Sequence, residues 1–262
     1  MPADGQPGSD GRPSTRGRGG DIVAGLRLAL TTLTVLPLRA GRVDRRAAVV
    51  AMSSAPLVGA LLGLVLAALL AVLEFAGAPH LLAAAVTVAA AALFTRGLHL
   101  DGLADTIDAL GSYRRGVEAL EIMKKSDIGP FGVAAVTLTL LIQTTAVAAL
   151  SPWALIPAWA AGRLAVTLAC RRGIPAARPT GLGALVAGTV PTPVAIALLV
   201  ITAAGATAAE SWQGPLAAIT AALAALLLIR HAVSRFGGIT GDVIGASVEL
   251  ATTTALITLT LG

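Results

Sequence analysis

Long runs of apolar residues constrain this chain more than any other feature of its sequence. A helix that crosses a bilayer needs roughly 20 consecutive, mainly apolar residues, and runs of about this length recur from Ala47 to the end of the chain. Because 56% of the 262 residues are hydrophobic and only 13% are charged, a water-soluble fold would leave many of these runs exposed. The sequence therefore predicts an all-α fold, a polytopic integral membrane helical bundle.

About seven transmembrane helices are predicted, separated by short polar connections. The sixth is short, and the seventh carries Asp242 and Glu249 in its first half. The predicted segments are residues 47–73, 79–95, 129–150, 153–170, 182–204, 215–229 and 242–261. Residues 21–262 are accordingly expected to form a single membrane domain.

The N-terminal region differs from the rest in composition. Residues 1–20 are rich in Gly, Pro, Ser and Arg and are predicted to be a disordered tail, because they cannot bury enough apolar surface to become ordered. Residues 21–38 are apolar but contain Arg27. This segment is consistent with a short span or with a helix lying in the membrane interface, and we favour the interfacial interpretation.

Lysine and arginine are unevenly distributed among the predicted connections. Residues 39–46, 96–127, 171–178 and 230–235 are basic or highly charged, whereas residues 74–78, 151–152 and 210–214 contain neither Lys nor Arg. Because cytoplasmic loops are enriched in these residues, we expect the charged connections on the cytoplasmic face of a bacterial plasma membrane. This bias and anionic lipid headgroups explain the net charge of +5 without a nucleic-acid partner.

The strongest functional signal is an acidic segment in the charged connection 96–128, which is predicted to be a helical, catalytic cytoplasmic loop. Asp101, Asp105 and Asp108 stand at positions i, i+4 and i+7, so in a helix their carboxylates share one face and repel one another. A divalent cation would relieve this repulsion, and Mg²⁺ prefers oxygen ligands and binds phosphates. The alternative is a solvated helix face. His99 is ambiguous, because a lone histidine is often structural.

Two further segments are candidates for phosphate binding. Lys124 precedes a Gly-Pro break and can hold phosphate as a compact charge, or it can simply belong to a loop before a helix. The second segment, residues 237–249, contains Gly238, Thr240 and Asp242 near a predicted helix start, where backbone amides favour phosphate. Its Asp242 and Glu249 lie in a predicted span, where ionisable groups are costly and commonly functional.

Several of these motifs resemble the cobalamin synthase family, also called the adenosylcobinamide-GDP ribazoletransferases. The resemblance rests on residues 96–108, 123–133 and 237–246, with supporting similarity at 56–63 and 175–183. It implies that a hydroxyl of α-ribazole attacks the cobinamide-linked phosphorus of adenosylcobinamide-GDP and releases GMP, with Mg²⁺ as the cofactor. The family often has an acid at position 125 and a base at 127, where this chain has Lys125 and Asp127, so the roles of these two positions stay open.

The resemblance, taken with the spacing, assigns roles to individual residues. The metal ligands are expected to be Asp101, Asp105, Asp108 and Asp242. One of these carboxylates or His99 would accept the hydroxyl proton, with Asp101, Asp105 and His99 as the catalytic candidates. Substrate phosphate would be bound by Arg96, Lys124, Gly238 and Thr240. The expected partners are the two substrates and the bilayer, with association into homo-oligomers or with other cobalamin-assembly enzymes left open.

Two other functions are each consistent with part of the sequence. A CDP-alcohol phosphotransferase also uses clustered aspartates to release a nucleotide from a pyrophosphate, but only residues 101–104 resemble part of its signature. A transporter would use Asp242, Glu249 and Arg163 to line a pathway through the membrane. The acidic residues cluster toward one predicted face rather than at the midplane, which favours the enzyme.

Overall fold

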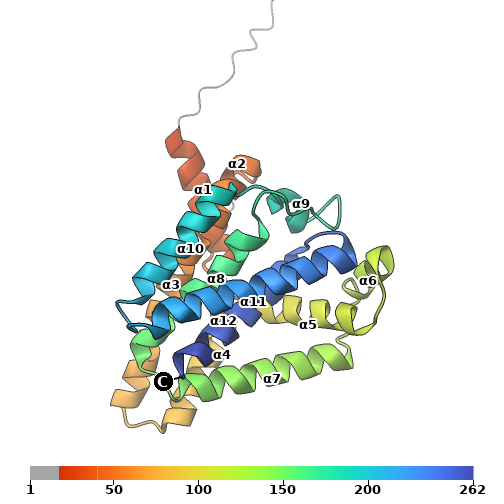
Figure 1. Cartoon of the computed structure of the whole chain (residues 1–262). Coiled ribbons are helices and arrows are strands. Elements are labelled where there is room, and N and C mark those ends of the chain that lie inside the picture. The colour runs from red at the N-terminus through yellow and green to blue at the C-terminus, as the bar shows by residue number, and fades with distance from the viewer. Residues whose placement is uncertain (1–17, 40, 262) are drawn as a thin grey trace, which may run out of the picture.

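The computed structural model describes residues 18–39 and 41–261, and this part of the chain contains helices and no strand (Figure 1). The predicted all-α class is therefore confirmed. The helices are α1 (Arg18–Leu33), α2 (Arg45–Ser53), α3 (Ala55–Phe75), α4 (His80–Phe94), α5 (Leu98–Gly111), α6 (Gly116–Ile122), α7 (Pro130–Val147), α8 (Leu155–Ala169), α9 (Leu182–Val186), α10 (Thr192–Ala206), α11 (Gln213–Phe236) and α12 (Gly241–Leu259), with a 3-10 turn at Pro152–Ala154.

Four of these helices, α3, α7, α11 and α12, are long and apolar enough to cross a membrane. The helices α4 and α5 together would make a fifth span, but they are bent by 86° at the break between them. The polytopic membrane fold is thus confirmed, with four or five complete spans by length and composition where about seven were predicted. We treat α5, which turns away from α4 at this bend, as lying outside the membrane-spanning segments.

Two predicted spans are each divided into two helices. The apolar run 47–73 divides at Ser54 into α2 and α3, with Pro56 in the first turn of α3, a position that proline favours. The run 182–204 divides into α9 and α10. Gly188 takes a positive φ of 67° between them, and Pro191 precedes the start of α10.

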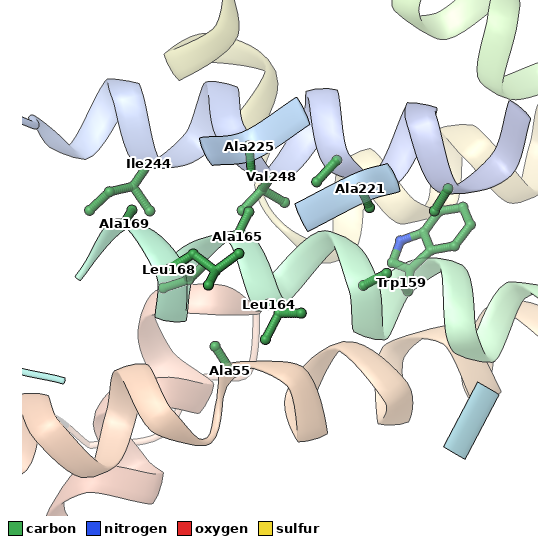
Figure 2. Close-up of a cluster of buried hydrophobic side chains, with 14 of the residues drawn as sticks. Ala55, Trp159, Leu164, Ala165, Leu168, Ala169, Ala221, Ala225, Ile244 and Val248 are labelled. Carbon is green, nitrogen blue, oxygen red and sulfur yellow. The ribbon is translucent and has the colours of Figure 1, made fainter. Parts of the chain in front are cut away.

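Helix α8 forms the centre of the bundle. Every residue of α8 except Ile156 is buried, and the helix packs against α3, α10, α11 and α12. Figure 2 shows the side chains between α8 and its neighbours, many of them alanines. Small residues let helix backbones approach closely in a membrane: a Cβ on Gly59 of α3 would lie only 2.4 Å from the Trp159 carbonyl oxygen of α8. Protein rather than lipid therefore covers this 15-residue helix.

The N-terminal helix α1 begins at Arg18. The last three residues of the predicted tail are therefore helical, and residues 1–17 lie outside the part of the chain that the structure describes. Helix α1 packs against α2 and is not among the helices long and apolar enough to span a membrane. Its interfacial location stays a prediction.

The basic connections contact one another, and so do connections without Lys or Arg. Two guanidinium groups link basic connections through backbone carbonyl oxygens: Arg178 to Leu120 and Arg235 to Arg114, each at 2.8 Å. A third, that of Arg45, donates to the Ala187 carbonyl oxygen at 3.0 Å, at the break between α9 and α10. Between connections without Lys or Arg, the Ser151 hydroxyl donates to the Glu210 carboxylate at 3.2 Å. In Figure 1, α5 and α6 lie on the side of the molecule away from the C-terminus.

Candidate active site

The acidic helix α5 packs tightly against the start of α12. Arg96 and Gly97 both have positive φ angles, 56° and 67°, and they turn the chain sharply into α5. A Cβ on Gly102 of α5 would lie 2.7 Å from the Asp242 carbonyl oxygen, and a Cβ on Gly245 of α12 would lie 3.2 Å from the His99 Cα. A glycine on each helix thus permits the contact, which places Asp242 beside α5.

The carboxylates influence one another through the charges they carry. Burial raises the pKa of Asp105 to about 6, the negative charges of Asp101, Asp242 and Asp108 add to the rise, and the Arg178 guanidinium opposes it. Asp105 therefore stands among three other carboxylates and one arginine. A site of this kind favours a bound cation or a transferred proton.

Asp108 has an additional structural partner. Its two carboxylate oxygens accept hydrogen bonds from the backbone amides of Gly129 at 2.7 Å and Gly132 at 2.8 Å, which are at the N-terminus of α7. These amides have no partner within the helix, and a carboxylate there is also favoured by the helix dipole. The carboxylate of Asp108 thus caps α7, and both of its oxygens are engaged.

His99 is buried at the interface of α5 and α12. Burial lowers the pKa of its imidazole to about 3, and the positive charge of Arg163 contributes. Its Nδ1 atom is buried and has no hydrogen-bond partner within the described residues. The ring is therefore neutral near pH 7, and such a low pKa is poorly matched to general-base catalysis.

The predicted phosphate-binding residues are dispersed. Lys124 is exposed and pairs with Glu121 at 3.1 Å, and the Arg96 guanidinium donates to the Thr31 carbonyl oxygen at 3.0 Å. Gly238 packs against another loop: a Cβ there would lie 2.5 Å from the Ala177 backbone nitrogen.

Thr240, predicted to bind substrate phosphate, lies beside Asp242. Its hydroxyl donates to Asp242 Oδ2 at 3.1 Å and accepts a hydrogen bond from the Val243 amide at 3.2 Å. The second bond caps α12. Thr240 thereby fixes the orientation of the Asp242 carboxylate.

Two cavities meet at Asp242. One, of about 260 Å³, is lined by His99, Asp101 and Asp242 together with apolar side chains that include Met52 and Val166. The other, of about 190 Å³, is lined by Arg178, Thr180, Thr240 and Asp242 and by residues 181–184. The residue-by-residue prediction missed Arg178, although the motif 175–183 that contains it was one of the segments carrying the family resemblance.

The acidic residues are suited in chemistry to a hard cation, but they are not drawn together around one. Among residues 18–39 and 41–261, no three His, Cys, Asp or Glu side chains are placed closely enough to hold a metal ion. Asp101, Asp105 and Asp242 nevertheless supply the carboxylate oxygens that Mg²⁺ prefers. Burial first, and then the charges of Asp101, Asp242 and Asp108, raise the pKa of Asp105, so a cation bound among these carboxylates would favour its ionised form.

The family model described as cobalamin-5-phosphate synthase matches residues 25–260. The chain belongs to this family. A curated adenosylcobinamide-GDP ribazoletransferase of Frankia casuarinae is 43% identical over 260 residues, covering 90% of this chain and 94% of the relative. A ribazoletransferase of a Nocardioides species is 40% identical, with 88% and 96% covered, and that of Bradyrhizobium diazoefficiens is 37% identical, with 86% and 89% covered. No solved structure matches the chain.

Proposed function

We propose that the chain is an adenosylcobinamide-GDP ribazoletransferase. It would join adenosylcobinamide-GDP to α-ribazole, or to α-ribazole 5′-phosphate, and release GMP. The observation that carries this proposal is the approach of Asp242 to the acidic face of α5 beside two cavities, in a chain whose cobalamin-synthase relatives carry this activity in their names. Phosphoryl transfer depends mainly on positioning and charge stabilisation, and this arrangement offers both.

In the proposed reaction, a ribose hydroxyl of α-ribazole attacks the cobinamide-linked phosphorus. A new O–P bond forms, the bond to the bridging oxygen of the pyrophosphate breaks, and its electron pair leaves with GMP. We assign the hydroxyl proton to Asp105, because a carboxylate with a pKa of about 6 is ionised at pH 7 and is a stronger base than an ordinary aspartate. The buried His99 would shape the cavity wall.

Asp101 and Asp242 are the proposed principal Mg²⁺ ligands, since both line the cavity that also contains His99. When bound, Mg²⁺ would neutralise the charge on the phosphate oxygens. The sequence predicted Asp105 both as a metal ligand and as a catalytic base, and we assign it the role of the base that accepts the hydroxyl proton. Asp108 is assigned to the N-terminus of α7, where its oxygens already accept two amides.

The proposed location is the bacterial plasma membrane, with the active site on the cytoplasmic face. The contacts of Arg178 with Leu120 and of Arg235 with Arg114 support a single face for the basic connections that they join, and Lys and Arg are enriched in cytoplasmic loops. The spanning helices α3, α7, α11 and α12 would anchor the site in the bilayer. Association into oligomers or with other enzymes stays a prediction.

The test uses the purified full chain in detergent with adenosylcobinamide-GDP, α-ribazole and Mg²⁺. Adenosylcobalamin and GMP are expected in equal amounts, measured by chromatography, and removal of divalent cations with EDTA should stop the reaction until Mg²⁺ is restored. Absence of both products with intact corrinoid substrate would overturn the proposal. Unchanged turnover in EDTA would overturn the role of Mg²⁺ alone.

A further inference from the structure

The loop formed by residues 171–181, which we call the arginine loop, is fixed against the start of α12. Two backbone hydrogen bonds hold it: Ala177 N–H donates to the Ile239 carbonyl oxygen and Ile239 N–H donates to the Pro175 carbonyl oxygen, each at 2.9 Å. Gly238 allows this contact, because any Cβ at that position would collide with the backbone of Ala177. The position of the arginine loop relative to the start of α12 is therefore fixed by backbone contacts.

Arg178 projects from this loop toward the acidic residues. One terminal nitrogen donates to the Leu120 carbonyl oxygen at 2.8 Å, which steadies the side chain. Its Nε is buried and lacks a hydrogen-bond partner within the described residues. The guanidinium also favours the ionised form of Asp105 and lines the 190 Å³ cavity with Asp242. Arg178 thus combines fixed position with unused hydrogen-bonding capacity.

The positive charge of Arg178 lies where a substrate phosphate would need it. A pyrophosphate substrate would bring further negative charge to carboxylates that already repel one another, so a fixed cation is needed on the phosphate side. Of the lysine and arginine side chains within residues 18–39 and 41–261, Arg178 alone lines either cavity at Asp242. Lys124 and Arg96 are engaged with Glu121 and with Thr31.

We propose that the cavity between Arg178 and Asp242 binds the guanosine-side phosphate of the nucleotide substrate, the phosphate that leaves as GMP. This inference rests on the proposed function and adds a substrate-binding residue to it. A guanidinium presents a planar fork of donors that matches phosphate oxygens, and Thr180 and Thr240 line the same space.

The size and lining of the two cavities agree with a phosphate in one cavity and α-ribazole in the other. A single water needs roughly 10–15 Å³, so a cavity of about 190 Å³ has room for a phosphate group with several waters. The neighbouring cavity contains Asp101, Met52 and Val166, and such mainly apolar walls suit the aromatic base of α-ribazole. Asp242 borders both cavities, where the two substrates would have to meet.

The inference is tested by the binding of radiolabelled GMP, with Mg²⁺, to the detergent-purified full chain in equilibrium dialysis. Arg178→Ala should weaken GMP binding about 10- to 100-fold, the loss expected for a charged hydrogen bond. It should raise the KM for adenosylcobinamide-GDP and leave the KM for α-ribazole unchanged. Arg178→Lys, which keeps the charge but loses the fork, should fall between Arg178→Ala and the unaltered protein. Arg172→Ala is the matched control, because Arg172 is an exposed arginine of the same loop.

A second pair of variants decides the question even if Arg178→Ala disturbs the contact with Leu120. Thr180 is exposed and lines the cavity, so Thr180→Glu and Thr180→Gln should both fold. They have nearly the same shape, but only Thr180→Glu places a negative charge beside the phosphate. Thr180→Glu should therefore weaken GMP binding at least 10-fold more than Thr180→Gln.

The two proposals fail in distinguishable ways. Normal formation of adenosylcobalamin, together with GMP binding that is equal in Arg178→Ala and the unaltered protein or equal in the two Thr180 variants, would overturn this inference and leave the ribazoletransferase function standing. An unaltered protein that makes adenosylcobalamin but does not retain GMP would also overturn it. A protein that forms no adenosylcobalamin overturns the proposed function.

Discussion

The backbone amide of Gly132 donates a hydrogen bond of 2.8 Å to the carboxylate of Asp108. This contact joins the acidic helix α5 to the N-terminus of α7, one of the membrane-spanning helices. It also requires glycine, since a Cβ on residue 132 would lie 2.5 Å from Asp108 Oδ2 and 3.0 Å from the Ala104 carbonyl oxygen. The Gly-Pro-Phe-Gly sequence at 129–132 thus holds the acidic helix α5 against α7.

The first prediction concerns the cost of filling this contact. Gly132→Ala should lower the free energy of unfolding by about 1–3 kcal/mol, the usual cost of an overpacked contact, as measured by thermal unfolding in detergent. Gly205→Ala is the matched control, because no atom lies within 4 Å of a Cβ there and Ala in a helix is favoured over Gly by roughly 0.5–1 kcal/mol. Equal stability of the two variants would contradict the role of Gly132.

The second prediction separates two aspartates that look equivalent in sequence. Asp108→Asn should destabilise the protein, because the side-chain amide has one oxygen to accept bonds from Gly129 and Gly132. Residual activity of this variant should show an unchanged requirement for Mg²⁺. Asp105→Asn should abolish turnover but leave thermal stability at pH 7 unchanged or higher, since the charged carboxylate is disfavoured at that position. Stability is followed by thermal unfolding and turnover by GMP release. The reverse pattern would exchange the two roles.

The helical segments could be predicted from sequence because burial of apolar side chains in lipid is a local property of each run. The lengths of the individual helices could not be predicted, because they depend on where the chain breaks a helix and on which other helices pack against it. Pro56 and Gly188 interrupt runs that hydropathy alone reads as continuous. Helix α8 is short, yet it is buried because α3, α11 and α12 surround it.

The acidic face of α5 was predictable for a similar reason, since spacing along one helix fixes which side chains share a face. The partners of those side chains come from elsewhere in the chain. Gly129 lies 21 residues from Asp108, and Arg178 reaches the site only because the arginine loop docks on Ile239. No spacing rule connects such positions, so sequence reasoning assigned Asp108 to metal and passed over Arg178.

The third prediction concerns pH. With a pKa of about 6, Asp105 is ionised and able to accept a proton above this pH and is protonated below it. The kcat/KM for transfer should therefore rise with pH through a midpoint near 6 and then level off. The midpoint should shift below 6 as the Mg²⁺ concentration increases, because a nearby cation favours the carboxylate. Activity is measured from pH 4.5 to 8 with thermal unfolding as the control for acid denaturation. A rate independent of pH across this range would exclude Asp105 as the base.

The fourth prediction concerns the buried polar groups of the membrane domain. The side-chain amide of Gln143 in α7 donates to Glu249 Oε2 at 2.9 Å and to Thr253 Oγ1 at 3.0 Å in α12. Both Gln143 and Glu249 are buried, and these bonds join two spanning helices. We interpret this network as a structural link rather than as part of a transport pathway, the role that an intramembrane glutamate had suggested.

Glu249→Leu should lower the free energy of unfolding by about 1–3 kcal/mol, because it deprives the buried Gln143 amide of an acceptor. Glu249→Gln is the matched control: it has the same size, still offers an oxygen, and should cost less. Both variants should keep the KM values of the unaltered enzyme for its two substrates, because Glu249 lines neither cavity at Asp242. Proteoliposomes should take up no free corrinoid, with or without the substitutions. Uptake that depends on Glu249 would instead support a pathway through the bundle, since a group that only links α7 to α12 affects stability and does not select a solute.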